Sequence, residues 1–401
     1  MGVVASVRRR ALRCWAARRA LPARAVATLV RALAILAPLA LVVPCNGVHA
    51  AAPSGTIATP VGFAHARVPW RFEFPRDHGA HFQFQSEWWY FTGHLRAADG
   101  RRFGYELTFF RYGLRPGERK PARGQSRWRG NQMYPVHLAV TDERGQRFVF
   151  DERFAREALG MGRASEGALD VAVGDWRLVG GPVFRMRAAS ANFGVDLVQV
   201  AEKAPAVHGH DGVSLKGSCA TCASHYYSMT RLRTSGTLVY LGQRFSVDGV
   251  SWMDHEFGSD ELQRDQVGWD WFSIQLDDRR EIMDYRLRVK GGALTPESSG
   301  SLVDARGGVR YLRRDDVGVE VVGAWRSPRT GGVYPSGWRV RVPSARLDLS
   351  LVPVVLDQEL SNLTGGVSYW EGAVDVNDAV SGRHLGIGYV ELTGYAGVVP
   401  H

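Results

Sequence analysis

The first 50 residues contain no aspartate and no glutamate, although they hold eight arginines. The whole chain has 50 basic and 40 acidic side chains, so the other 351 residues have 42 basic and 40 acidic ones and a net charge of only +2. Surfaces that bind nucleic acid need a large local excess of positive charge. The body of the protein lacks that excess, and we expect no nucleic-acid partner.

The acid-free leader lacks the long apolar run of a membrane-spanning helix. Its apolar segment, residues 32–43, is interrupted by Pro38 and precedes the small-residue sequence VHAAA at residues 48–52. A basic start, a short apolar run and a small-residue cleavage site are typical of a secretory signal peptide. We expect cleavage after Ala50 and a periplasmic or secreted mature protein; an uncleaved N-terminal anchor is the alternative.

Cysteine is scarce. The chain has four, and removal of the leader leaves only Cys219 and Cys222. A single Cys-Ala-Thr-Cys pair in an exported protein is more often a disulfide than a metal site. Free thiols are one alternative, and a metal or redox role is another, with His208, His210 and His225 as the nearest further metal ligands. We predict a Cys219–Cys222 disulfide, no metal and no cofactor.

Long helical periodicity is nearly absent, and Glu152–Met161 is the only segment expected to form a short helix. The rest reads as short strands separated by turns, such as Trp88–Arg96 and Arg102–Tyr112 around Asp99-Gly100. Many short strands at regular spacing indicate a sandwich or a barrel. We predict an all-β fold of two tandem antiparallel barrels, residues 51–248 and 249–401, after a signal peptide at residues 1–50, with Gly258–Gln266 as a polar linker.

The sequence has no glycine-rich phosphate loop, no Gly-x-Ser-x-Gly elbow and no His-Glu-x-x-His helix. The strongest cluster is instead Asp254-His255-Glu256, between Trp252 and Phe257. On a strand, Asp254 and Glu256 would share one face and His255 would lie on the other. A carboxylate pair desolvated by aromatic rings could keep a proton near neutral pH, as a general acid requires. A structural hydrogen-bond network at the domain junction would need the same residue types.

Three aromatic segments offer further candidates: residues 86–93, 268–273 and 369–372. Each would contribute to an aromatic cavity if its strand lines a barrel, and each could equally serve as core packing or as a solvated hairpin. The candidate catalytic residues are Asp254, His255, Glu256 and Asp270. The candidate ligand-binding residues are Glu87, Trp88, Trp89, Tyr90, Trp252, Trp269, Trp271, Tyr285, Tyr369 and Trp370.

Six segments carry a resemblance to a known family: SEWWYFTG at 86–93, ASHYYS at 223–228, WMDHEFG at 252–258, WDWFSIQL at 269–276, YWEG at 369–372 and GIGYVELTGY at 386–395. Together they resemble the AttH-like secreted proteins, which are related to the carotenoid 1,2-hydratases. The resemblance covers residues 60–398. It implies two packed lipocalin-like barrels and export; members are labelled as predicted secreted hydrolases or as components that accompany an ABC export system.

The related hydratases add water across an isoprenoid double bond without an organic cofactor. That reaction needs a carboxylic acid, aromatic faces beside the cation and a positioned water. His255 matches a histidine expected to matter in the hydratases, and Phe257 replaces the usual tryptophan. Our first hypothesis is an exported protein that binds a hydrophobic small molecule or lipid. The alternative is a hydratase or secreted hydrolase acting on an isoprenoid or lipid by acid catalysis; a third is an accessory subunit of an envelope transporter.

Overall fold

The computed structural model describes residues 62–117, 126, 130–259 and 262–396. The predicted signal peptide and its cleavage site lie outside the described residues. Within the described part of the chain, none of the helices has the length and apolarity that a membrane crossing requires.

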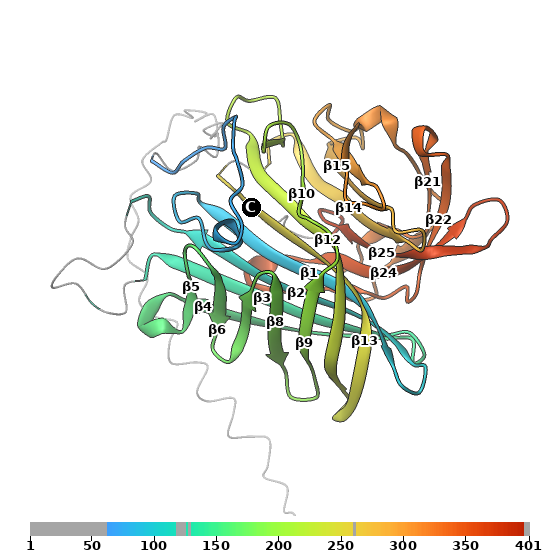
Figure 1. The fold of residues 1–401 in the computed structure, drawn as a ribbon, viewed down its shortest axis with the longest axis horizontal. Helices are drawn as coiled ribbons and strands as arrows, with labels where there is room; N and C mark the ends of the chain where they lie inside the picture. Colours follow the sequence, from blue (N-terminus) through green and yellow to red (C-terminus); the bar gives the residue numbers. More distant parts are fainter. Residues whose placement is uncertain (1–61, 118–125, 127–129, 260–261, 397–401) are drawn as a thin grey trace, which may run out of the picture. The chain divides into compact units, whose positions relative to one another are not determined.

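The first sheet has 13 antiparallel strands (Figure 1). In sheet order these are β4 (Arg147–Arg156), β3 (Gln132–Asp142), β2 (Arg102–Gly113), β1 (Ser86–Ala97), β13 (Gln243–Gly258), β12 (Ala223–Tyr240), β9 (Phe193–Ala201), β8 (Val183–Ala189), β7 (Trp176–Gly180), β6 (Leu169–Val173) and β5 (Gly162–Ala164), with β10 (Ala206–Val207) and β11 (Ser214–Leu215) paired to β12. The sheet curls until β5 lies against β3 and β4, which gives a nearly closed barrel.

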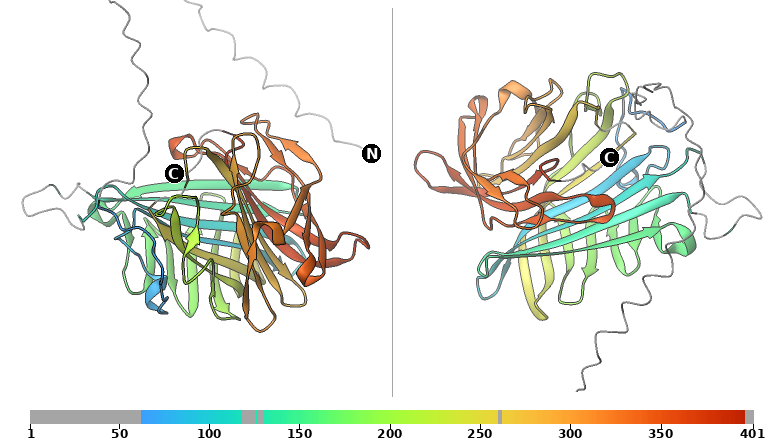
Figure 2. Two further views of the ribbon diagram at one scale, coloured as in Figure 1. Left: turned by 90° about the horizontal axis from the view of Figure 1, so that it is seen from above. Right: turned by 180° about the vertical axis from the view of Figure 1, so that it is seen from behind.

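The second sheet has 10 strands and curls into a half-barrel, orange and red in Figure 2. In sheet order these are β17 (Val309–Arg313), β16 (Ser299–Val303), β15 (Glu281–Val289), β14 (Gln266–Leu276), β25 (His384–Leu392), β24 (Tyr369–Asp378), β22 (Leu347–Pro353), β21 (Trp338–Val342) and β18 (Gly318–Val321), with β23 (Glu359–Leu360) paired to β24. A separate hairpin joins β19 (Ala324–Arg326) to β20 (Val333–Pro335).

Five 3-10 turns complete the described elements: η1 (Arg76–His78), η2 (Ala158–Gly160), η3 (Arg314–Asp316), η4 (Pro343–Ala345) and η5 (Thr364–Gly366). The predicted all-β class is confirmed.

Period-two alternation explains why the strands form where they do. On β2, Phe103, Tyr105, Leu107 and Phe109 share the face that packs in the barrel interior, and all four are buried. Burying each large apolar side chain contributes about 1.5–3 kcal/mol of transfer free energy. A shift of the register by one residue would move all four to the opposite face.

The helix expected at Glu152–Met161 is wrong. Residues up to Arg156 continue β4, and only the single turn η2 follows. β4 pairs with β3 along its whole length, from Arg147 opposite Asp142 to Arg156 opposite Met133. This ladder satisfies the backbone polar groups that β4 turns toward β3, and the pairing overrides the local helix preference of its Glu, Ala and Arg residues.

The chain passes from the first sheet to the second between Gly258 and Gln266. β13 crosses the predicted boundary at residue 248 without a break, and it pairs with β1 as far as Gly258. Residues 249–258, which include the Asp254 cluster, therefore lie in the first sheet.

The two sheets pack face to face through a buried layer of their own, distinct from the two barrel cores. This layer contains Tyr90, Tyr226 and Trp252 from the first sheet and Trp271, Tyr285 and Tyr389 from the second. The approach is close, since a Cβ at Gly104 of β2 would collide with Tyr389 and Ala373 of the second sheet. The outer face of the first sheet is thus an internal wall of the molecule.

Candidate functional site

A cavity of about 620 Å³ lies in the layer between the two sheets. Strands β1, β2, β3, β4, β12 and β13 supply one wall, and β14, β15, β24 and β25 supply the other. Ten of the 28 lining residues are aromatic: Trp88, Tyr90, Phe110, Tyr112, Phe154, Tyr226, Trp269, Trp271, Tyr285 and Tyr369. Five carboxylates interrupt this apolar surface: Glu152, Asp254, Glu256, Glu371 and Glu391.

Alternation along β1 separates the four candidates of the first aromatic segment. Trp88 and Tyr90 line the cavity. Trp89 is fully buried in the barrel core, and Glu87 contacts His255 and Arg111 on that same side. Half of this segment therefore belongs to the cavity and half to the barrel interior.

The same rule divides the Asp254 cluster as the sequence predicts. Asp254 and Glu256 line the cavity, whereas His255 lies on the opposite face of β13. The ring of Trp89 stacks on His255, with ring centroids 5.0 Å apart. His255 is fully buried, and a ligand in the cavity would not touch it.

Asp254 is a buried carboxyl group whose hydrogen bonds come from uncharged donors. Tyr226 donates to Oδ2 at 2.5 Å, and Trp252 Nε1 donates to Oδ1 at 2.6 Å. Ser228 also donates to Oδ1 and is itself held by His208 Nε2 at 2.6 Å. Burial outweighs these bonds and raises the pKa of Asp254 to about 7, and the nearby Glu256 adds to the rise. Asp254 can therefore hold or release a proton near neutral pH.

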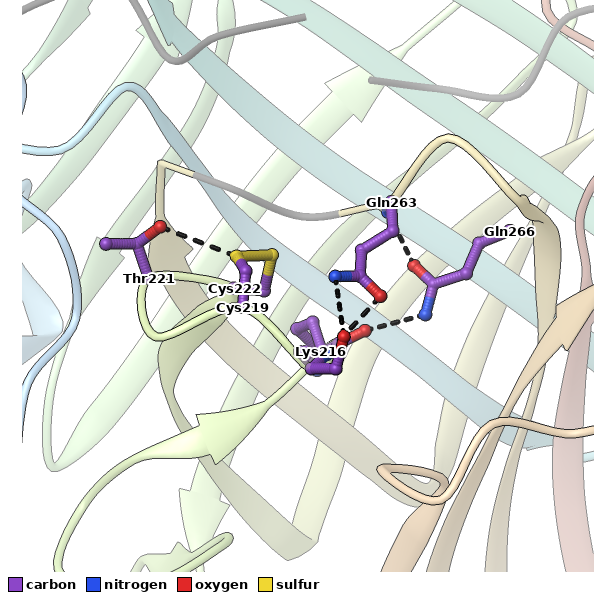
Figure 3. The surroundings of a disulfide bond; sticks show 7 residues. Lys216, Cys219, Thr221, Cys222, Gln263 and Gln266 are labelled. Carbon is purple, nitrogen blue, oxygen red and sulfur yellow. Dashed lines mark hydrogen bonds between the residues drawn. A yellow bond between two sulfur atoms is a disulfide. The ribbon is translucent and has the colours of Figure 1, made fainter. Parts of the chain in front are cut away.

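Glu256 has a charged partner. Lys216 Nζ lies 2.7 Å from Glu256 Oε1 and 4.2 Å from the ring centroid of Tyr285. The predicted Cys219–Cys222 disulfide is present and closes the loop that follows Lys216 (Figure 3). The Lys216 N–H donates to the Cys222 carbonyl, and the Gln266 side chain donates to the Lys216 carbonyl. The disulfide loop thus holds the lysine at the cavity.

Two carboxylates come from the second sheet. Tyr90 donates to Glu371 Oε1 at 2.7 Å, and Trp269 Nε1 donates to Glu391 Oε2 at 2.9 Å. Burial, reinforced by Glu391 and Glu106, raises the pKa of Glu371 well above its usual value. Desolvation raises the pKa of Glu391 to about 7, against the hydrogen bond from Trp269. The cavity therefore contains three carboxyl groups that resist ionisation.

Residues 65–395 match the AttH-like family. The chain belongs to the AttH-like family. The resemblance seen in the sequence is confirmed. A comparison with curated proteins gives no match.

Two solved structures place this AttH-like chain among known folds. A Nitrosomonas europaea protein assigned to AttH is 32% identical, with a TM-score of 0.74 over 83% of this chain and 100% of that one. Kievitone hydratase from Nectria haematococca is 14% identical, with a TM-score of 0.61 over 84% of this chain and 96% of that one. The second likeness shows a shared fold alone.

Three further sequence candidates of the AttH-like chain lie off the cavity, in addition to Glu87, Trp89 and His255. Asp270 points away from it and pairs with Arg288 Nε at 2.9 Å, while Tyr395 donates to the same carboxylate. Trp370 packs in the core of the second sheet. Trp252 is buried behind Asp254 and acts on the cavity only through its hydrogen bond.

Sequence reasoning missed Tyr226, Lys216, Glu371 and Glu391 as site residues of the AttH-like fold. Glu371 had a visible signal, because alternation on β24 places it on the same face as Tyr369. Glu391 is a lone acid in the apolar strand Gly386–Leu392. Tyr285 and Tyr369 were predicted and do line the cavity.

Two groups bear on metal binding. The candidate ligand His208 bonds to Ser228 and Ser301 instead of joining the cysteines. On the barrel side of the first sheet, His81, Glu87 and His255 bring three ligand atoms within 4.8 Å of one another. The cavity itself offers acid–base chemistry, from carboxyl groups poised near neutral pH beside aromatic faces.

Proposed function

We propose that the protein binds an apolar, unsaturated small molecule in the cavity between its sheets, and that it adds or removes water there by acid catalysis. The observation that carries this proposal is Asp254, a buried carboxyl group with a pKa of about 7 in an aromatic wall. Burying several uncompensated carboxyl groups costs folding free energy, and a passive apolar container would not need them.

The cavity suits such a ligand in size and lining. Pockets of roughly 300–1,000 Å³ with aromatic walls and a few placed polar groups bury most of a small molecule. Here the aromatic rings would contact the apolar body of the ligand, and the carboxyl groups would meet its reacting bond.

Asp254 would act as the proton donor. Its proton passes to one carbon of a double bond, and the positive charge that develops on the other carbon lies against the faces of Trp271 and Tyr226. A water molecule attacks that carbon while an ionised Glu391 accepts the proton that the water loses. Asp254 is then ionised and Glu391 carries the proton lost by the water, and proton exchange with solvent restores both groups. The reverse sequence would remove water.

A fold shared with a kievitone hydratase is compatible with this reaction and assigns none, because the identity is only 14%. The second candidate function is binding and carriage of a lipid without turnover. The ten aromatic side chains in the lining favour this carriage of a lipid.

One pair of variants separates the two functions. Asp254→Asn keeps the shape of the side chain and removes the acid. Asp270→Asn removes another buried carboxylate, one that pairs with Arg288 and does not line the cavity. Incubation with a panel of isoprenoid alkenes in heavy-oxygen water, followed by mass spectrometry, should detect labelled alcohol with wild type and Asp270→Asn. Asp254→Asn should show at least about a hundred-fold less product. Intact lipid in an organic extract of wild type, with no labelled product, would favour carriage.

We also propose that the protein is exported, because a disulfide is the expected state of a cysteine pair in an oxidising compartment. N-terminal sequencing of the mature protein should begin after Ala50; retention of residues 1–40 would contradict export with cleavage. An association with envelope transporter components stays a prediction, for which copurification from membranes is the measurement.

A further inference from the structure

A compact group of potential metal ligands lies on the face of the first sheet that is turned away from the cavity. His81 precedes β1, Glu87 lies on β1 and His255 lies on the neighbouring β13. Glu87 Oε1 is 2.9 Å from His81 Nδ1 and 2.9 Å from His255 Nε2. All three side chains are buried. The proposed function uses none of them.

The outer nitrogens of the two rings have hydrogen-bond acceptors. His255 Nδ1 lies 3.0 Å from the Asp77 carbonyl oxygen, which can only accept a hydrogen bond. The Tyr227 hydroxyl near the same nitrogen donates to that carbonyl as well. His81 Nε2 lies 3.5 Å from Asp77 Oδ1. A neutral imidazole has one N–H, so rings that donate outward to Asp77 turn bare nitrogens toward Glu87 Oε1.

Two bare ring nitrogens and a carboxylate oxygen that face one another repel unless a cation lies between them. Histidines that bind a metal commonly donate their other N–H to a carboxylate or a backbone carbonyl, which fixes the tautomer and the ring orientation. Asp77 supplies both kinds of acceptor, its carboxylate to His81 and its carbonyl to His255. Stacking also holds the rings, since the ring centroids of His81 and Phe257 are 3.7 Å apart.

Arg111 holds the other oxygen of the same carboxylate. Its Nε donates to Glu87 Oε2 at 2.8 Å, and its remaining N–H groups bond to Gln132 and to the backbone carbonyls of His81 and Phe84. The guanidinium thus leaves Oε1 directed at the two rings. The carboxylates of Glu87 and Asp77 offset two of the three positive charges that Arg111 and a divalent cation would bring.

We propose that His81, Glu87 and His255 bind one divalent transition-metal ion, of which Zn²⁺ is the best fit. Two imidazole nitrogens and one carboxylate oxygen are ligands that this class of ion prefers. In a tetrahedral zinc site the ligand atoms lie about 3.3 Å apart. The two 2.9 Å separations from Glu87 Oε1 would expand slightly, and the two ring nitrogens already lie within 4.8 Å of each other. The ion would tie the segment before β1 to β1 and β13, and it would stabilise the fold.

The test uses the full chain purified without a polyhistidine tag. Elemental analysis after growth with added zinc should find one zinc ion per chain. Glu87→Gln should abolish this binding, whereas His225→Gln should retain it. His225 is a matched control because it is a fully buried histidine near the same cluster that bonds to the Gly212 carbonyl and not to Glu87.

A second measurement needs no variant. Wild-type protein stripped with a chelator and titrated with Co²⁺ should develop the visible absorption of a four-coordinate cobalt site, saturating at one ion per chain. Wild type that takes up neither ion would overturn the proposal and establish a metal-free network in which both rings donate to Glu87. Retention of the full metal content by a folded Glu87→Gln variant would also overturn it.

Discussion

Glu87 and Asp254 lie on adjacent strands of one sheet, face opposite sides of it, and differ in charge although both are buried. Burial alone would raise the pKa of Glu87, but the guanidinium of Arg111 holds it below its usual value. Asp254 has only neutral donors, and its pKa rises to about 7. The extent of burial does not explain why the pKa values of these two carboxyl groups shift in opposite directions. The charge of the hydrogen-bond partner explains it. The sheet thereby keeps an anion, Glu87, on one face and an exchangeable proton, on Asp254, on the other.

Removing the guanidinium of Arg111 should have the largest effect on the free energy of unfolding. Arg111→Met leaves Glu87 buried without its cationic partner, and we expect a loss of about 3–5 kcal/mol in the free energy of unfolding. Denaturant unfolding measures it. Arg177→Met, which removes an exposed ion pair with Asp170, is the control and should cost less than about 1 kcal/mol. A loss at Arg111 no larger than in the control would contradict this account of Glu87.

The pH dependence of stability should show the opposite behaviour of Asp254. Its folded pKa of about 7 lies above the ordinary value of 3.8, so the folded state holds the proton more tightly than the unfolded chain. The stabilisation is therefore full below about pH 4 and is lost as the pH rises through about 7. Asp254→Asn removes this dependence, so its stability relative to wild type should rise between pH 5 and pH 9 by roughly 3 kcal/mol, which is about two pH units at 1.36 kcal/mol each.

Thermal unfolding of both proteins across that range measures the effect. Asp270→Asn should show a smaller gain of the same sign, because Arg288 offsets part of the burial that raises the pKa of Asp270. A constant difference between Asp254→Asn and wild type would mean that Asp254 is ionised throughout.

Loss of the disulfide should lower the free energy of unfolding by less, and it acts on Glu256, a carboxylate that pairs with a lysine. Glu256 depends on Lys216, which the Cys219–Cys222 loop holds in place. Closing so short a loop contributes about 1–2 kcal/mol. We expect Cys219→Ser with Cys222→Ser to lower the free energy of unfolding by that amount. Thiol counting on denatured, unreduced wild type should find no free thiol from this pair, and two would refute the bond.

Glu371→Gln should have the smallest effect. The raised pKa of Glu371 favours the neutral form of this carboxyl group, and a neutral amide can still accept the hydrogen bond from Tyr90. We expect a change of less than about 1 kcal/mol at pH 7. A larger loss, measured by the same denaturant unfolding, would show that Glu371 is ionised in the fold.

Alternation is the part of the fold that the sequence predicts well. It separates Asp254 and Glu256 from His255, and it places Phe103, Tyr105, Leu107 and Phe109 on one side of β2. Both results follow from the two-residue period of a strand, which needs no knowledge of the partner strand.

Partners distant in the chain are the part that local patterns do not predict. Asp270 has aromatic neighbours in the sequence, as Asp254 does, but Arg288 on β15 pairs with it. Tyr90 and Glu371 meet only because two sheets dock. His81 lies outside every strand pattern, and its role depends on Asp77 and on a strand far along the chain. Such contacts depend on how distant segments pack in three dimensions, and the spacing of residues along one strand does not predict that packing.

The hydrogen bond from Tyr90 to Glu371 crosses 281 positions of the sequence and joins the two sheets at the cavity. A substitution on either side leaves a buried polar group without its partner, so each residue limits what the other can become. In an alignment of AttH-like sequences, positions 90 and 371 should therefore change together more often than neighbouring pairs do. The two sheets would then have evolved as one unit, and exchanging one sheet between distant members should yield folded chimaeras only when both positions come from the same parent.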